Sequence, residues 1–145
     1  MLRKLGAETG VEMDGIIITP LKRISHQKGD IYHALRTSDN GYTSFGEAYF
    51  TTIVGGETKG WKKHLRMTMN LVVPVGLVRF YFRHDNGKTD NIILGETNYQ
   101  RLTVSSGLWV AFSGLSNSLN LVLNVADIEH DQTESINVPL DTYAL

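Results

Sequence analysis

Basic and titratable side chains gather in one short stretch of this sequence. Lys59, Lys62, Lys63, His64 and Arg66 all lie between residues 59 and 66. Lys62 and His64 are two positions apart, so on a β-strand their side chains point to the same face. A histidine placed beside a lysine can take a proton from a bound molecule or return one to it. This stretch is therefore the first candidate site for acid–base chemistry.

Three interpretations of this pair are open on residue type alone. His64 can carry the proton with Lys62 beside it, or Lys62 can itself be the base when it is removed from water. In the third interpretation, Lys62 and its neighbour are solvated surface lysines and His64 is hydrogen-bonded to another residue. Tyr49 and His33 are further acid–base candidates, and the sequence does not place either of them beside Lys62.

The composition limits the other kinds of chemistry that the chain can perform. It has no cysteine, which excludes disulfide scaffolds, zinc–thiolate sites, iron–sulfur clusters and thiol nucleophiles. Its 14 basic and 15 acidic residues nearly cancel, which argues against a nucleic-acid partner and a membrane-surface role. No apolar run has the roughly 18–20 residues of a spanning helix, and the N-terminus lacks the apolar stretch of a signal peptide. We therefore expect a cytoplasmic protein.

The elements that position these side chains are predicted to be β-strands. No segment keeps helical apolar spacing for three turns, whereas short strand-like runs recur with turn signals between them. From residue 65 to residue 71 the odd positions are apolar and the even positions are polar, which predicts a strand. The polar residues from Lys62 to Asn70 then form either a solvent-exposed face or the polar lining of a barrel. The other predicted strands are 15–19, 45–53, 77–84, 91–94, 99–104, 108–112 and 119–125.

These segments predict one all-β domain of two packed sheets. A length of 145 residues suits a single core, and about nine short strands joined by hairpins are typical of a sandwich or barrel. Asp85-Asn86-Gly87-Lys88 predicts a tight hairpin in which Asn-Gly supplies positive φ angles. We place the domain at residues 15–145, after an N-terminal segment of residues 1–14. The acidic stretch 127–134 is expected to be an exposed loop.

Three stretches of the sequence together resemble one known family. They are Ile17-Ile18-Thr19-Pro20-Leu21-Lys22 with Lys28-Gly29-Asp30; Gly46-Glu47-Ala48-Tyr49-Phe50 with Lys59-Gly60-Trp61-Lys62-Lys63-His64; and Val73-Pro74-Val75-Gly76 with Ser105-Ser106-Gly107 and Asn124-Val125-Ala126-Asp127. In this order and spacing they resemble a short, divergent branch of the dTDP-4-dehydrorhamnose 3,5-epimerase family of the cupin superfamily. The resemblance implies a cupin-type β-jelly-roll barrel and a homodimer that exchanges N-terminal strands.

The same resemblance indicates what occupies the cupin metal positions. By that alignment they hold Lys62, His64, Met69 and Val110. A protonated lysine and a valine offer no lone pair to a metal ion, and a single histidine is a poor site on its own. We therefore expect no metal, and the epimerase family implies no other cofactor.

The family's reaction removes a proton beside a C4 ketone, stabilises the enolate, and returns a proton from the opposite face. By the resemblance, the family's histidine base corresponds to Lys62, and its enolate-binding lysine corresponds to Met69. Its tyrosine acid falls near Ile128 or Glu129. The aspartate that orients the base has only Asp141 as a loose counterpart. The family's standard machinery is therefore largely replaced.

The resemblance suggests binding residues as well. The family holds the diphosphate of the sugar nucleotide with basic residues that correspond to Lys28 and Lys59, where a lysine supplies a point charge rather than a bidentate fork. His33 stands where the family often has a glutamate. Arg66 and Arg79 can reach phosphate if their strands face the cavity.

Two functional hypotheses follow, and a purely structural role is left open beside them. In the first, the chain is a metal-independent epimerase or isomerase that acts on a nucleotide-linked 4-keto-6-deoxyhexose in surface-polysaccharide biosynthesis. In the second, it is a non-catalytic cupin that binds a sugar nucleotide or a partner enzyme. The first hypothesis assigns Lys62 and His64 as catalytic residues, and as substrate-binding residues it assigns Lys28, His33, Lys59 and Arg66.

Overall fold

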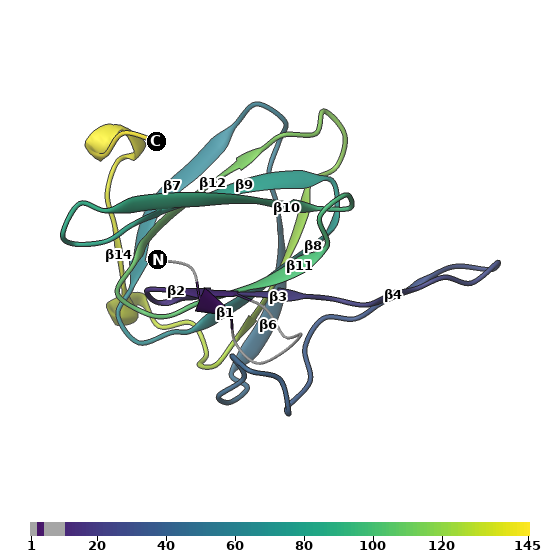
Figure 1. Ribbon diagram of the computed structural model, residues 1–145. Helices are drawn as coiled ribbons and strands as arrows, with labels where there is room; N and C mark the ends of the chain where they lie inside the picture. The colour runs from purple at the N-terminus through teal and green to yellow at the C-terminus, as the bar shows by residue number, and fades with distance from the viewer. Residues whose placement is uncertain (1–2, 5–10) are drawn as a thin grey trace.

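The structure is a computed structural model that describes residues 3–4 and 11–145, and these residues form two antiparallel β-sheets packed against each other (Figure 1). The seven-stranded sheet has the order β1-β2-β3-β11-β8-β13-β6, and the five-stranded sheet has the order β10-β9-β12-β7-β14. A separate hairpin, β4-β5, projects away from both sheets (Figure 1). This arrangement confirms the predicted all-β jelly-roll barrel.

The strands of the seven-stranded sheet are β1 (Arg3–Lys4), β2 (Val11–Met13), β3 (Ile16–Pro20), β6 (Glu47–Thr52), β8 (Met69–Val75), β11 (Gln100–Val104) and β13 (Leu121–Ala126). Those of the five-stranded sheet are β7 (Thr58–His64), β9 (Leu77–Arg83), β10 (Thr89–Gly95), β12 (Trp109–Gly114) and β14 (Ser135–Asn137). The projecting hairpin consists of β4 (Arg23–Ile24) and β5 (Ile31–Tyr32). Two short 3₁₀ helices, η1 (Gln132–Glu134) and η2 (Leu140–Thr142), follow β13.

Apolar side chains at alternating positions hold the two sheets together. In β9 the burial alternates strictly, and Val78, Phe80 and Phe82 face inward. Full burial of such a side chain contributes about 1.5–3 kcal/mol, so slipping a strand by one residue would be costly. The alternation therefore fixes which residues face the interior. The opposite sheet contributes Ile16, Ile18, Leu71, Val73, Leu102 and Val104 to the same core.

The hairpin between β9 and β10 forms where it is predicted, with a different turn geometry. Strand pairing runs from Leu77 opposite Gly95 to Arg83 opposite Thr89. In this turn only Gly87 has a positive φ, of +90°, whereas the sequence suggested that Asn86 would share it. Asn86 instead accepts a hydrogen bond through Oδ1 from the Lys88 amide at 2.9 Å. The Asn-Gly signal thus predicts the position of the turn but not its type.

The predicted strand at residues 65–71 is wrong in its first half. Residues 65–68 connect β7 to β8 and belong to neither strand. The amides of Arg66 and Met67 donate to the Oε2 atom of Glu134, at 3.2 and 3.1 Å. These amides are satisfied by a side chain instead of by a neighbouring strand, so the alternating apolar pattern does not lead to sheet pairing here.

The prediction that the acidic stretch 127–134 is an exposed loop is confirmed for residues 129–133 and wrong at its two ends. Glu134 is fully buried, and Asp127 is half-buried. Asp127 accepts a hydrogen bond through Oδ1 from the Thr68 amide at 2.8 Å, and so fixes the same β7–β8 turn. Asp131 caps η1 by accepting from the Thr133 amide at 2.8 Å. Two carboxylates in this stretch are therefore structural groups of the interior.

Part of the predicted N-terminal segment can be placed. Residues 1–2 and 5–10 lie outside the described residues. Residues 11–13 form β2, which pairs with β3 from Met13 opposite Ile16 to Val11 opposite Ile18 and extends the seven-stranded sheet. No helix in the described part of the chain combines the length and hydropathy needed to cross a membrane.

A fully buried arginine ties the loop before β6 to the outer face of the seven-stranded sheet. Arg101 on β11 donates to the main-chain oxygens of Ala34 and Asn40, at 2.9 and 3.1 Å. It also donates to Oδ1 of Asn70 and to Oδ2 of Asp39, both at 3.1 Å. Removing this guanidinium would take away the donor to the main-chain oxygens of Ala34 and Asn40, and would leave Asp39 with the exposed Arg36 as its remaining ion-pair partner.

We therefore predict that Arg101→Met lowers the free energy of unfolding by about 3–5 kcal/mol, the usual result of breaking a buried ion pair from one side. Chemical denaturation measures this change. Arg36→Met is the matched control, because Arg36 also contacts Asp39 but its side chain is 73% exposed, and we expect that variant to lose about 1 kcal/mol or less. Equal losses in the two variants would contradict the role given to Arg101.

Candidate functional site

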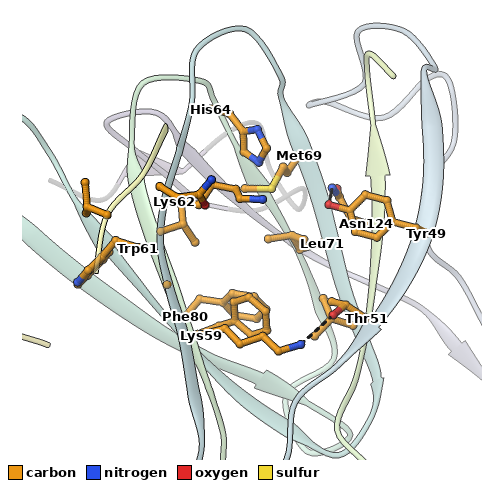
Figure 2. Close-up of a pocket in the computed structure, with 16 residues that line it drawn as sticks. Tyr49, Thr51, Lys59, Trp61, Lys62, His64, Met69, Leu71, Phe80 and Asn124 are labelled. Atoms are coloured by element: carbon orange, nitrogen blue, oxygen red, sulfur yellow. Dashed lines mark hydrogen bonds between the residues drawn. The ribbon is translucent and has the colours of Figure 1, made fainter. Parts of the chain in front are cut away.

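A cavity of about 370 Å³ lies between the two sheets (Figure 2). Strands β6, β8 and β13 form one wall, and β7, β9 and β12 form the other. Its volume is in the range of small-molecule sites, and none of the described residues that line it is acidic. Its apolar lining consists mainly of Met69, Leu71, Phe80, Val110, Phe112 and Val122. Its main polar lining residues are Tyr49, Thr51, Lys59, Lys62, His64 and Asn124.

Lys62 and His64 both point into this cavity from β7, as their two-residue spacing predicts (Figure 2). β7 is held on both sides, since Lys62 pairs with Val110 of β12 and His64 pairs with Ser135 of β14. Lys63, between them, turns to the outer face and donates to Asp85 at 2.9 Å. The strand therefore separates the two lysines, and only Lys62 belongs to the cavity.

His64 is held by a buried carboxylate. Its Nδ1 atom is hydrogen-bonded to Oε1 of Glu134, which lies at the end of η1 and is 0% exposed. A carboxylate acceptor requires the proton of the neutral imidazole to sit on Nδ1. The lone pair of that ring is then on Nε2, which none of the described residues engages in a hydrogen bond. His64 therefore presents an unused proton acceptor at the cavity.

Glu134 remains ionised in this environment. Burial by itself would raise the pKa of its carboxyl group, but the hydrogen bond from His64 and those from the amides of Met67 and Arg66 outweigh burial and hold that pKa below the usual value of 4.5. Both carboxylate oxygens have donors, so the burial is fully compensated. Glu134 is thus a fixed negative charge behind the imidazole.

Lys62 extends into the cavity from the same wall as His64 (Figure 2). Within residues 3–4 and 11–145, no hydrogen bond or ion pair occupies its ammonium group. A lysine without a partner in a cavity free of acidic lining residues can meet negative charge on a bound molecule.

Lys59 crosses the cavity from one sheet to the other. Its Nζ atom donates to the main-chain oxygen of Thr52 at 2.7 Å and lies 3.4 Å from Oγ1 of Thr51, both on β6 (Figure 2). It also lies 5.9 Å from the ring centroid of Phe112. Lys59 therefore adds positive charge at the cavity and joins β7 to β6.

Tyr49 and Asn124 lie on the wall opposite Lys62 and His64 (Figure 2). Tyr49 belongs to β6 and Asn124 to the adjacent β13, where the two residues are directly opposite each other. The Nδ2 atom of Asn124 donates to the Tyr49 hydroxyl oxygen at 3.0 Å. The two walls thus bring four titratable side chains to one space: Tyr49, Lys59, Lys62 and His64.

Three residues predicted to bind substrate lie elsewhere. Lys28 is exposed on the projecting β4–β5 hairpin, and His33 lines a separate hollow on the outer side of the seven-stranded sheet. Arg66 directs its guanidinium to Asp131 at 3.2 Å, outside the cavity. Arg79 also points away, toward Asn91. Within one chain, the structure does not bring these side chains to the cavity.

All four positions assigned to the cupin metal site, Lys62, His64, Met69 and Val110, do line the cavity. The donor set does not fit a metal, because it offers one imidazole and one thioether beside an ammonium and a valine. Among the residues that the structure describes, no cluster of three or more histidines and carboxylates is placed to hold a metal ion. No chemical step is therefore assigned to a metal.

Glu134 is the residue that sequence reasoning missed. Asp141, the loose candidate for orienting the base, is exposed in η2 and does not line the cavity. Glu134 instead precedes Ser135, whose pairing with His64 brings the carboxylate to the imidazole. β14 has only three residues, SIN, and they carry no recognisable strand pattern. The only signal in the sequence is an acidic residue just before a short β-branched segment.

Solved structures of sugar-nucleotide enzymes are similar to this chain. The dTDP sugar isomerase from Desulfovibrio desulfuricans G20 is 30% identical, with a TM-score of 0.86 over 89% of this chain and 87% of that one. QdtA, a sugar 3,4-ketoisomerase from Thermoanaerobacterium thermosaccharolyticum in complex with TDP, is 17% identical, with a TM-score of 0.74 over 86% of this chain and 89% of that one.

A third similar structure is RmlC from Legionella pneumophila, a dTDP-6-deoxy-D-glucose-3,5-epimerase in complex with dTDP-4-keto-L-rhamnose. It is 14% identical, with a TM-score of 0.77 over 91% of this chain and 77% of that one. At these identities QdtA and RmlC show the fold alone, whereas the Desulfovibrio isomerase shows the family. No protein-family model and no curated protein sequence matches the chain.

The lowered pKa of Glu134 predicts a pH dependence of stability. A carboxyl group whose pKa falls on folding stabilises the protein above its unfolded pKa, and this stabilisation is lost as the pH falls through the folded-state pKa. We therefore expect Glu134→Gln to be less stable than the wild type at pH 7. On acidification below about pH 4.5, the variant is expected to lose less stability than the wild type loses.

Denaturant unfolding between pH 7 and pH 3 measures both effects. Glu129→Gln, which removes an exposed carboxylate from the same stretch, controls for the change in net charge. Parallel stability profiles for Glu134→Gln and the wild type would contradict the assignment of Glu134 as a buried, ionised group.

Proposed function

Because the chain belongs to the dTDP-4-dehydrorhamnose 3,5-epimerase-like family of the cupin superfamily, we propose that it is an isomerase or epimerase of a nucleotide-linked 4-keto-6-deoxyhexose. It acts without a metal, in the cytoplasm, in the biosynthesis of a surface polysaccharide. The observation that carries this proposal is the His64 imidazole, held by buried Glu134 with Nε2 facing a cavity in whose described lining no residue is acidic.

The cavity suits both parts of such a substrate. A 6-deoxyhexose carries an apolar methyl group, which can contact the lining formed by Leu71, Phe80 and Val122. A diphosphate is negatively charged and is attracted by the ammonium group of Lys59. No acidic residue in the described lining of the cavity competes with the diphosphate for that ammonium. The 30% identical Desulfovibrio structure is likewise that of a dTDP sugar isomerase.

The proposed chemistry begins with proton transfer from carbon to His64. The Nε2 lone pair takes the proton from a carbon next to the C4 ketone, the C–H electron pair forms a carbon–carbon double bond, and the ketone oxygen becomes negative. Glu134 stabilises the imidazolium that forms, since its carboxylate already accepts from Nδ1. The ammonium of Lys62 stabilises the enolate oxygen, a role that Met69 cannot fill.

We also propose that two copies of the chain associate as a homodimer, as the family resemblance implies. The β4–β5 hairpin projects from the barrel (Figure 1) and exposes Ile24 and Ile31, 46% and 56% exposed. Exposed apolar side chains on a projecting element favour contact with another protein surface. We propose that Lys28 and His33 contribute to substrate binding, as the resemblance implies, only in such a dimer, since neither reaches the cavity of its own chain.

The first functional prediction concerns His64. In deuterium oxide, the protein is expected to place deuterium at C3 or C5 of TDP-4-keto-6-deoxyglucose, because both carbons flank the ketone. His64→Asn is expected to slow this exchange by about 100-fold or more, the usual contribution of a general base. Proton NMR of the substrate measures the exchange.

His130→Asn, a change of the same type at an exposed histidine, is expected to exchange at the wild-type rate. Wild-type protein that places no deuterium in the substrate would overturn the catalytic proposal. If that protein still bound the nucleotide sugar, the non-catalytic hypothesis would take its place.

The second functional prediction concerns Lys59. Replacing it with methionine is expected to weaken dTDP binding about tenfold, since a hydrogen bond to a charged group contributes about 1.5 kcal/mol or more. Isothermal titration calorimetry with dTDP measures this loss. Lys63→Met is the matched control, because Lys63 lies on the same strand with its side chain on the opposite face. Equal affinities of the two variants would exclude Lys59 as a diphosphate ligand.

A further inference from the structure

Inverting a carbon centre requires proton transfer on both of its faces. A single base can remove a proton and return it, but the proton then comes back to the face that it left. Inversion therefore needs a second proton donor on the opposite side of the bound sugar. In this cavity, His64 and Lys62 both come from β7, so neither can serve as the group on the other side.

Among the described residues, two groups with an acidic proton reach the opposite wall, and one of them, the Lys59 ammonium, already donates to the main-chain oxygen of Thr52 at 2.7 Å. The other is the hydroxyl of Tyr49. Tyr49 projects from β6 into the cavity and faces the wall formed by β7 (Figure 2). Of the other polar residues on that wall, Thr51 lies against the Lys59 ammonium and Asn124 has no acidic proton. Ile128 and Glu129, the positions at which the family has its tyrosine, do not line the cavity.

The hydrogen bond of Tyr49 leaves its proton free. Asn124 is 1% exposed, and its Nδ2 atom donates to the Tyr49 hydroxyl oxygen at 3.0 Å. The tyrosine oxygen is therefore an acceptor in this contact, and its own O–H donates to none of the described residues. The same amide can continue to donate to the phenolate after the proton has left. Tyr49 is also 40% exposed, so water can return the proton.

We propose that Tyr49 is the acid that protonates the enolate from the face opposite His64, which makes the reaction an epimerisation. This inference rests on the proposed function of the cavity. The enolate carbon uses its electron pair to take the proton from the Tyr49 hydroxyl, the C4 carbonyl forms again, and the phenolate remains. His64 then releases its extra proton to water and Tyr49 regains one, so no oxidant, reductant or further reactant is consumed. Asn124 acts as a positioning residue for Tyr49.

The test separates exchange from inversion. TDP-4-keto-6-deoxyglucose is incubated in deuterium oxide with the wild type, with Tyr49→Phe, and with Tyr81→Phe, and NMR follows both deuterium content and configuration at C3 and C5. Tyr81 is the matched control, because it packs on the outer face against the Trp61 and Trp109 cluster. Tyr49→Phe removes one oxygen from a side chain that is 40% exposed, so it is expected to fold normally.

The expected result is that Tyr49→Phe continues to exchange deuterium while its inversion slows by about 100-fold or more, and that Tyr81→Phe behaves as the wild type. Inversion by Tyr49→Phe at the wild-type rate would overturn the inference, as would loss of exchange and inversion in equal measure. Exchange without inversion in the wild type would also overturn it, and would leave the proposed function standing. Absence of exchange in the wild type would overturn both.

Discussion

The carboxylate of Glu134 is the constraint on which the rest of the site depends. It is buried, it holds Nδ1 of His64, and it accepts from the amides of Arg66 and Met67 in the turn that follows β7. One side chain therefore satisfies a turn and orients an imidazole. Oε1 holds the imidazole and Oε2 accepts from the two amides, so removing this one carboxylate would end both tasks.

The cavity differs from the pattern that the family resemblance implies, although a cation and an imidazole still line it. The family's base position holds Lys62 and its enolate-lysine position holds Met69, so the positive charge stands on β7 instead of β8. The imidazole is two residues further along β7, where Glu134 can reach it. The cation thus stands at the family's base position and the imidazole stands two residues away, and both face the cavity because side chains two apart on a strand point the same way.

The sequence predicts the fold well because alternation and hairpin signals are local. The strands around Phe80 and Leu102 and the turn at Gly87 follow from residue types alone. The spacing of Lys62 and His64 likewise predicts that they share a face. The turn at residues 65–68 and the role of Glu134 could not be predicted, because they arise from hydrogen bonds between residues almost seventy positions apart. Tyr49 could be named as a candidate, but only the pairing of β6 with β13 puts it opposite His64.

The most direct test of this account is the tautomer of His64. Two-dimensional ¹H–¹⁵N NMR of the imidazole nitrogens, at a pH where the ring is neutral, distinguishes a proton on Nδ1 from one on Nε2. The account predicts that Nδ1 carries the proton in the wild type, because the Glu134 carboxylate can only accept. A wild-type ring protonated at Nε2 would contradict the account, because His64 would then have no lone pair to offer to a substrate in the cavity.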